Sequence, residues 1–183
     1  MASNPASSRA RDTALLVDAA IELFGERGPD AVTLREVAAA AGVNYGLIHQ
    51  YVGTKDDLLR LALRRVSSDS AERFSADPVT DTIDRLVGRE GASASLRLLA
   101  WAILMGRSAD ELMGRSVGLP ALAARLGTDD DEARAAVVLA MSLLFGWQLF
   151  GDYLTGAIGL PPASRAESAA TVRDEVRRLL GVA

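Results

Sequence analysis

The side chains best suited to chemistry lie in one short segment, residues 44–52, of a chain of 183 residues. On a helix, at about 100° per residue, Ile48 centres the buried side, with Asn44, Tyr51 and Val52 near it. The opposite arc then presents Tyr45, Gly46, Leu47, His49 and Gln50. This arc is uncharged, but Gln can pair with adenine, Leu can meet a thymine methyl, and Tyr or His can bind phosphate oxygens. We expect the arc to contact DNA. Taken alone, each residue could also be a surface residue without a binding role or could cover the small core.

Two residues in this region are unfavourable for helix stability. Gly46 weakens a helix, so its presence indicates that a binding partner approaches the backbone closely at this position. Lys55 begins the next predicted helix, where a cation opposes the helix dipole but can help exposed N–H groups to hold a phosphate. An indifferent surface lysine is the alternative. Arg9 and Arg11 could likewise form an arm along the DNA backbone or belong to a solvated tail.

The elements that position these residues begin and end at clear signals. An apolar stripe repeating every four residues predicts a helix over 12–26, and Gly28-Pro29 ends it. Thr33 and Glu36 form a predicted capping box for a helix over 34–41, which Gly42 terminates. Asn44 caps the next short helix through Val52. Two short helices joined by a glycine turn form a helix-turn-helix.

The remainder of the chain also shows helical periodicity. Thr54, with Asp57 at the third position, caps a predicted long helix from Lys55 to about Phe74, and Asp77-Pro78 breaks it. Further helices are predicted at about 79–89, 92–107, 109–125, 130–156 and 163–181. Residues 1–8 are expected to be a loose tail. The fold class is therefore all-α, with about nine helices.

Composition excludes several classes of site. The chain has no cysteine and one histidine, so thiol chemistry and multi-histidine or cysteine metal sites are excluded, and we expect no metal or cofactor. Asp129-Asp130-Asp131 is better explained as acids at a helix start. The net charge of −4 comes from residues 66–183, because residues 1–65 hold eight basic and eight acidic side chains. An overall negative charge therefore does not argue against DNA binding by the first third.

The location is expected to be cytoplasmic. Asp12, Asp18 and Glu22 interrupt the apolar block that a signal peptide would need. The longest uncharged run, 135–151, is closely bounded by Arg134 and Asp152 and favours a buried core helix over a membrane span.

Residues 10–60 resemble the DNA-binding domain of the TetR family of transcriptional regulators. The matching segments are 19–28 (AAIELFGERG), 33–38 (TLREVA) and 41–55 (AGVNYGLIHQYVGTK). The resemblance implies that Thr33 and Lys55 hold phosphates and that Asn44, Tyr45 and Gly46 open the recognition helix. It also implies phosphate or base contacts at His49 and Tyr51 and a sequence-dependent contact at Gln50. Ile48 and Val52 depart from the larger residues common in the family.

By the same resemblance, residues 1–55 form a tail and an N-terminal three-helix DNA-binding domain, and residues 56–183 a C-terminal helical domain for effector binding and dimerisation. The expected protein is a regulator, most simply a repressor, that binds a palindromic operator in double-stranded DNA as a homodimer. A small, largely apolar effector would release it. From an aromatic and methionine-rich set on the later helices, Trp101, Met105, Phe145 and Trp147 are candidates to line the effector pocket.

Two other classes of function remain open from the sequence. A helical ligand-binding or scaffold protein whose helix-turn-helix has lost DNA affinity fits the uncharged arc and acidic total. An enzyme would need a nucleophile–base or metal constellation, and the single histidine leaves only carboxylates such as Asp110/Glu111. We therefore expect no catalytic residues.

Overall fold

The computed structural model describes residues 5–88, 92–107, 118–127 and 131–182. Within these ranges the chain is helical, with no strand. The elements are α1 (Pro5–Arg27), the 3-10 turn η1 (Pro29–Ala31), α2 (Leu34–Ala41), α3 (Tyr45–Val52), α4 (Lys55–Ala76), α5 (Val79–Val87), α6 (Ala94–Leu104), α8 (Gly118–Arg125), α9 (Asp131–Ala157) and α10 (Ala163–Leu180). The all-α prediction is confirmed.

The chain divides into two compact units. Unit 1 comprises Met1–Ser68 and Ala94–Ser116, and unit 2 comprises Asp69–Ser93 and Val117–Ala183. Helix α4 begins in the first unit and ends in the second, and α6 belongs to the first although it follows α5 in sequence. The packing units therefore differ from the predicted functional boundary at residue 55, which stays a prediction.

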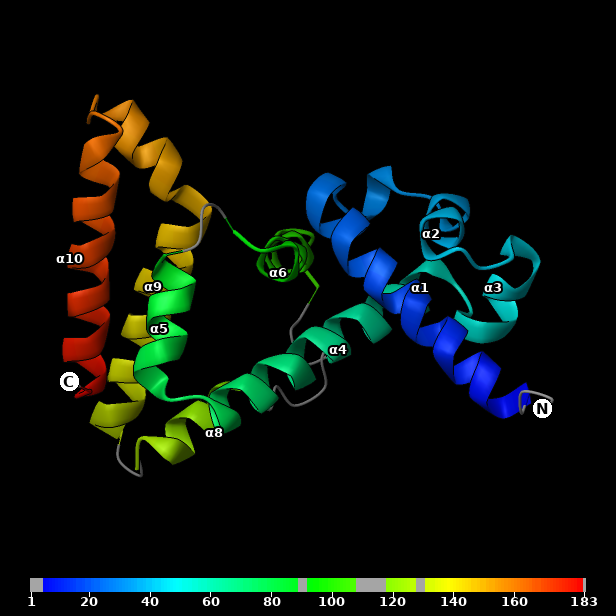
Figure 1. The fold of residues 1–183 in the computed structure, drawn as a ribbon, viewed down its shortest axis with the longest axis horizontal. Coiled ribbons are helices and arrows are strands. Elements are labelled where there is room, and N and C mark those ends of the chain that lie inside the picture. Colours follow the sequence, from blue (N-terminus) through cyan, green and yellow to red (C-terminus); the bar gives the residue numbers. More distant parts are fainter. Residues whose placement is uncertain (1–4, 89–91, 108–117, 128–130, 183) are drawn as a thin grey trace. The chain divides into compact units, whose positions relative to one another are not determined.

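Unit 1 is built around α1, which α2, α3 and α6 contact (Figure 1). Leu16, Ala20 and Phe24 on the predicted stripe of α1 are fully buried, whereas Leu15 is 40% exposed. They share a core with residues from the other helices of this unit, among them Val37, Ile48, Leu58, Leu63, Leu98 and Ala102. The prediction of a loose tail over residues 1–8 is wrong for residues 5–8, which form the first turn of α1 with Pro5 at its start.

Unit 2 has its own apolar core between α5, α8, α9 and α10. Met141 and Leu144 of α9 and Val176 of α10 are buried in it. One face of α10 packs on this core, because Ala169 and Val176 are buried and Val172 and Leu179 pack against the same residues. Asp129, Asp130, Asp110 and Glu111 lie outside the described residues.

Candidate nucleic-acid interface

The helix-turn-helix is made by local signals at α2 and α3. Gly42 ends α2 with φ 65°, in the left-handed region that glycine adopts without strain. Asn44 then starts α3, because its side-chain oxygen accepts a hydrogen bond of 2.8 Å from the Gly46 N–H. Ile48 and Val52 anchor α3 in the core of unit 1. The capping residues and both helix ranges agree with the sequence prediction.

The predicted arc of α3 lies at the surface. Tyr45, Gly46, His49 and Gln50 are exposed, and Leu47 is half-buried. The Tyr45 and His49 rings meet edge to face with centroids 6.3 Å apart. The predicted burial of α3 is thus confirmed, except that Asn44 is exposed. Contact of these residues with DNA stays a prediction.

His49 also contributes to the end of α3. Its Nδ1 lies 3.1 Å from the carbonyl oxygen of Gly53, the residue that terminates α3. In the neutral tautomer with the proton on Nδ1, the ring donates to that carbonyl and Nε2 remains an acceptor. The geometry therefore limits how the ring can turn and leaves one nitrogen for a partner.

Two arginines from neighbouring helices lie against the tyrosines of α3. The Arg35 guanidinium, on α2, is 5.1 Å from the centroid of the Tyr45 ring. The Arg9 guanidinium, on α1, is 5.7 Å from the centroid of the Tyr51 ring and donates a 2.8 Å hydrogen bond to the Gln50 carbonyl. Arg35 was missed by the sequence prediction, because a single arginine on an exposed helix face gives no signal of its own.

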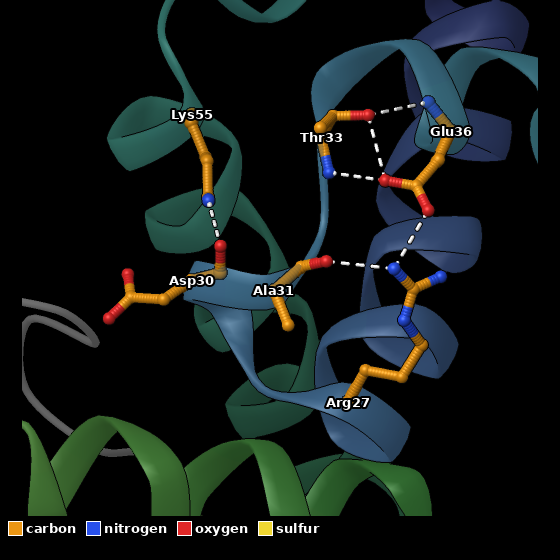
Figure 2. Close-up of polar contacts among 6 residues, drawn as sticks. All are labelled: Arg27, Asp30, Ala31, Thr33, Glu36 and Lys55. Carbon is orange, nitrogen blue, oxygen red and sulfur yellow. Dashed lines mark hydrogen bonds and ion pairs between the residues drawn. The ribbon is translucent and has the colours of Figure 1, made fainter.

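Thr33 takes part in the predicted capping box, which is confirmed. Its N–H and hydroxyl both donate to Glu36 Oε2, at 2.7 and 2.8 Å, and its oxygen accepts from the Glu36 N–H at 3.2 Å. Arg27 Nη2 donates to Glu36 Oε1 at 2.7 Å (Figure 2). The hydrogen bonds from Thr33, with that from Arg27, lower the pKa of Glu36 from 4.5 to about 2. Thr33 is therefore tied into a fixed, exposed helix start.

The 29–31 turn is held from two helices, α1 and α4. Arg27 donates to the Ala31 carbonyl at 2.7 Å, and Lys55 Nζ lies 3.4 Å from the Asp30 carbonyl (Figure 2). Lys55 is half-buried and its ammonium has two further donors. Lys55 thus contacts the turn that precedes Thr33, and a phosphate contact by Lys55 and Thr33 together stays a prediction.

The start of α4 is stabilised in the same way as that of α2. The Asp57 carboxylate accepts from the Thr54 N–H at 2.9 Å and from its hydroxyl at 2.7 Å, which lowers the pKa of Asp57. Asp56 accepts a 2.7 Å hydrogen bond from Arg107, which lowers the pKa of Asp56. The carboxylates of Asp56 and Asp57 interact favourably with the positive end of the α4 dipole, which the Lys55 cation opposes.

Helix α6 approaches α1 most closely at Ala94 and Gly25. A Cβ at Gly25 would lie 2.4 Å from the Ala94 carbonyl oxygen. Arg97 Nε donates a 2.9 Å hydrogen bond to the Gly25 carbonyl, near the C-terminal end of α1. The Trp101 ring covers Gly28, where a Cβ would lie 3.2 Å from it. Trp101 thus has a packing role at the end of α1.

The four candidate effector residues do not form one cluster within either unit. Trp101 and Met105 belong to unit 1, while Phe145 and Trp147 belong to unit 2. Trp147 lines an apolar groove of about 530 Å³ together with Ser142, Leu143, Gly146, Phe150, Tyr153, Leu154 and Val172. Phe150 and Tyr153 are 56% and 72% exposed, so the groove is open at the surface of α9 and α10. A role of these four residues in effector binding stays a prediction.

Comparisons with known proteins agree with the helix-turn-helix. The family model of bacterial regulatory proteins, tetR family, matches residues 16–62. The HTH-type transcriptional repressor Rv3405c of Mycobacterium tuberculosis is 35% identical over 177 residues, which cover 95% of this chain and 92% of that protein. The HTH-type transcriptional regulator BetI of Rhizobium meliloti is 30% identical over 152 residues, covering 83% of this chain and 67% of that protein.

Solved structures support the fold. A tetR-family transcriptional regulator from Mesorhizobium loti aligns with a TM-score of 0.61 at 20% identity, over 94% of this chain and 96% of that one. The long match to a curated repressor over nearly both full lengths is the stronger finding, and these relatives are regulators rather than enzymes. The chain belongs to the tetR family of HTH-type transcriptional regulators.

Proposed function

We propose that the protein is a homodimeric transcriptional repressor that binds a palindromic operator through α3 and is released by a small effector. The observation that carries DNA binding is the surface of α3. Asn44 caps the helix, Ile48 and Val52 hold it to the core, and the arc that remains exposed bears hydrogen-bonding groups and no charge. Gln50, exposed near the middle of that arc, is the residue best suited to read a base.

The DNA test uses labelled duplexes from the region flanking the gene, titrated with protein at several salt concentrations. The wild type is expected to prefer duplexes that contain an inverted repeat, with a strong salt dependence. Gln50→Ala should reduce the preference for that repeat by about 1–3 kcal/mol while leaving the salt slope unchanged. Lys55→Gln should lower the slope by about one instead. Absence of any salt-sensitive duplex binding would favour a helical protein that has lost DNA affinity.

Dimerisation is supported by the outward face of α9. Val138, Leu139, Phe150, Tyr153 and Leu154 are between 53% and 72% exposed, and the apolar groove continues this face. By length and composition, Arg134–Ala157 could cross a membrane, and only 33% of its apolar window is buried inside the described chain. A DNA-binding regulator acts in the cytoplasm, so a membrane is not the partner of this apolar face. A second copy of the chain that covers the face explains its composition. We accordingly assign Trp147 and its groove to the dimer interface rather than to the effector.

Effector binding is supported by a polar atom within unit 2. Gln148 is 6% exposed, and within the described chain its Oε1 has no hydrogen-bond partner. An unpaired buried acceptor costs about 1–3 kcal/mol, so a largely apolar molecule that donates one hydrogen bond there would be favoured. The test is release of the bound duplex by a panel of small apolar amides and alcohols, followed in the wild type and in Gln148→Leu. Release that is equal in both proteins would contradict this placement.

A further inference from the structure

The recognition helix has an arginine stacked on a tyrosine at each of its two ends. Arg35 lies over Tyr45, the first residue of α3, and Arg9 lies over Tyr51, the residue before its last. The arginines come from different helices, α2 and α1, and both are exposed. Two separate elements therefore place the same kind of group beside α3.

The two stacks border the exposed arc. At about 100° per residue, the arc begins at Tyr45 and passes through His49, Gly46 and Gln50 to Leu47. Tyr51 follows Leu47 on the far side, next to the buried Ile48. One arginine thus lies along each edge of the surface that faces a groove, with the uncharged arc between them.

The two arginines lie beside a helix that has no cationic side chain of its own. Helix α3 contains no lysine or arginine, yet binding to DNA needs cations that neutralise phosphates. A helix in the major groove has one phosphate backbone on each side. Guanidinium groups stacked on aromatic rings are held in place while their N–H groups stay available, and Arg9 uses Nη2 alone for the Gln50 carbonyl.

We propose that Arg35 and Arg9 bind phosphates on the two opposite strands of the duplex and supply the positive charge that α3 lacks. Tyr45 and Tyr51 position them. The proposal rests on the DNA binding proposed above, but it concerns residues outside α3 and contacts that carry no sequence information.

The test needs no operator. A fluorescein-labelled duplex of about 30 bp and arbitrary sequence is titrated between about 50 and 200 mM salt. Each of Arg35→Ala and Arg9→Ala should weaken binding about five- to tenfold and lower the salt slope by about 0.9, and the double variant by about 1.8. Arg134→Ala is the control, because Arg134 is an exposed arginine of α9 in unit 2 that pairs with Asp131 at 3.3 Å. It should keep the wild-type slope.

Conservative variants separate phosphate binding from a structural role. Arg35→Lys keeps the charge and should keep the slope. Tyr45→Phe keeps the ring that positions Arg35 and should keep the slope, whereas Tyr45→Ala should lose part of the affinity. Melting temperatures identify any variant that is unfolded, and Arg35→Gln and Arg9→Gln, which keep the length of the side chain, then replace it. Folded Arg35 and Arg9 variants with the wild-type slope would overturn the proposal, even if their affinity falls. No duplex binding by the wild type would instead overturn the proposed function.

Discussion

At the scale of single residues, the same side-chain pairing is used twice to start a helix. Thr33 with Glu36 and Thr54 with Asp57 each satisfy the free N–H groups of a helix, and each pairing is visible in the sequence because its members are three residues apart. The contacts of Arg9, Arg27 and Arg35 were not predictable. They join residues that are close only after folding, and long flexible side chains carry no pattern in sequence.

Glu36 makes the stability of unit 1 depend on pH. Its folded pKa, about 2, lies below its ordinary value of 4.5, so the folded state favours the carboxylate. The contribution is complete above about pH 4.5 and is lost as the pH falls through about 2. We expect Glu36→Gln to melt below the wild type at neutral pH and the difference to shrink in acid, measured by circular dichroism. Glu26→Gln, an exposed glutamate of α1, is the control. A difference that does not change with pH would contradict this assignment.

At the scale of elements, the helix-turn-helix could be predicted and the position of α6 could not. Caps, glycine stops and the apolar spacing of α1, α2 and α3 act over a few residues, so their ranges follow from sequence. The packing of α6 on α1 depends on Gly25 meeting Ala94, about seventy positions away, and nothing local marks that glycine. For the same reason the contact of the Trp101 ring with Gly28 could not be predicted.

Gly25 should therefore be the least replaceable helical glycine of unit 1. Gly25→Ala places a methyl group 2.4 Å from the Ala94 carbonyl oxygen and forces α6 away from α1. Overpacking of this kind costs about 1–3 kcal/mol, or roughly 3–10 °C in melting temperature. Gly156→Ala on α9 is the matched control, since a Cβ there meets nothing within 4 Å and alanine favours a helix. Equal melting temperatures for the two variants would contradict the close packing.

At the scale of the whole molecule, the apolar face of α9 is the proposed link between dimer assembly and DNA recognition. A single recognition helix of eight residues reads few base pairs, so specificity requires two copies with their helices about one turn of DNA apart. A symmetric dimer brings the same face of each copy together. Sequence periodicity indicated a buried helix over 130–156, but it could not distinguish burial inside the chain from burial against a partner.

Leu154→Glu tests this link. Leu154 is 53% exposed and lines the apolar groove, so a glutamate there would be buried without a partner in the dimer. The wild type should sediment at about twice 19.3 kDa at micromolar concentration, and the variant as a single chain with its helix content unchanged. The variant should keep weak duplex binding and lose its preference for an inverted repeat. Arg134→Glu adds a glutamate elsewhere on α9 and should remain dimeric. A wild-type protein that stays monomeric would contradict the proposed dimer. A Leu154→Glu variant that still dimerises and selects the repeat would contradict an interface on this face of α9.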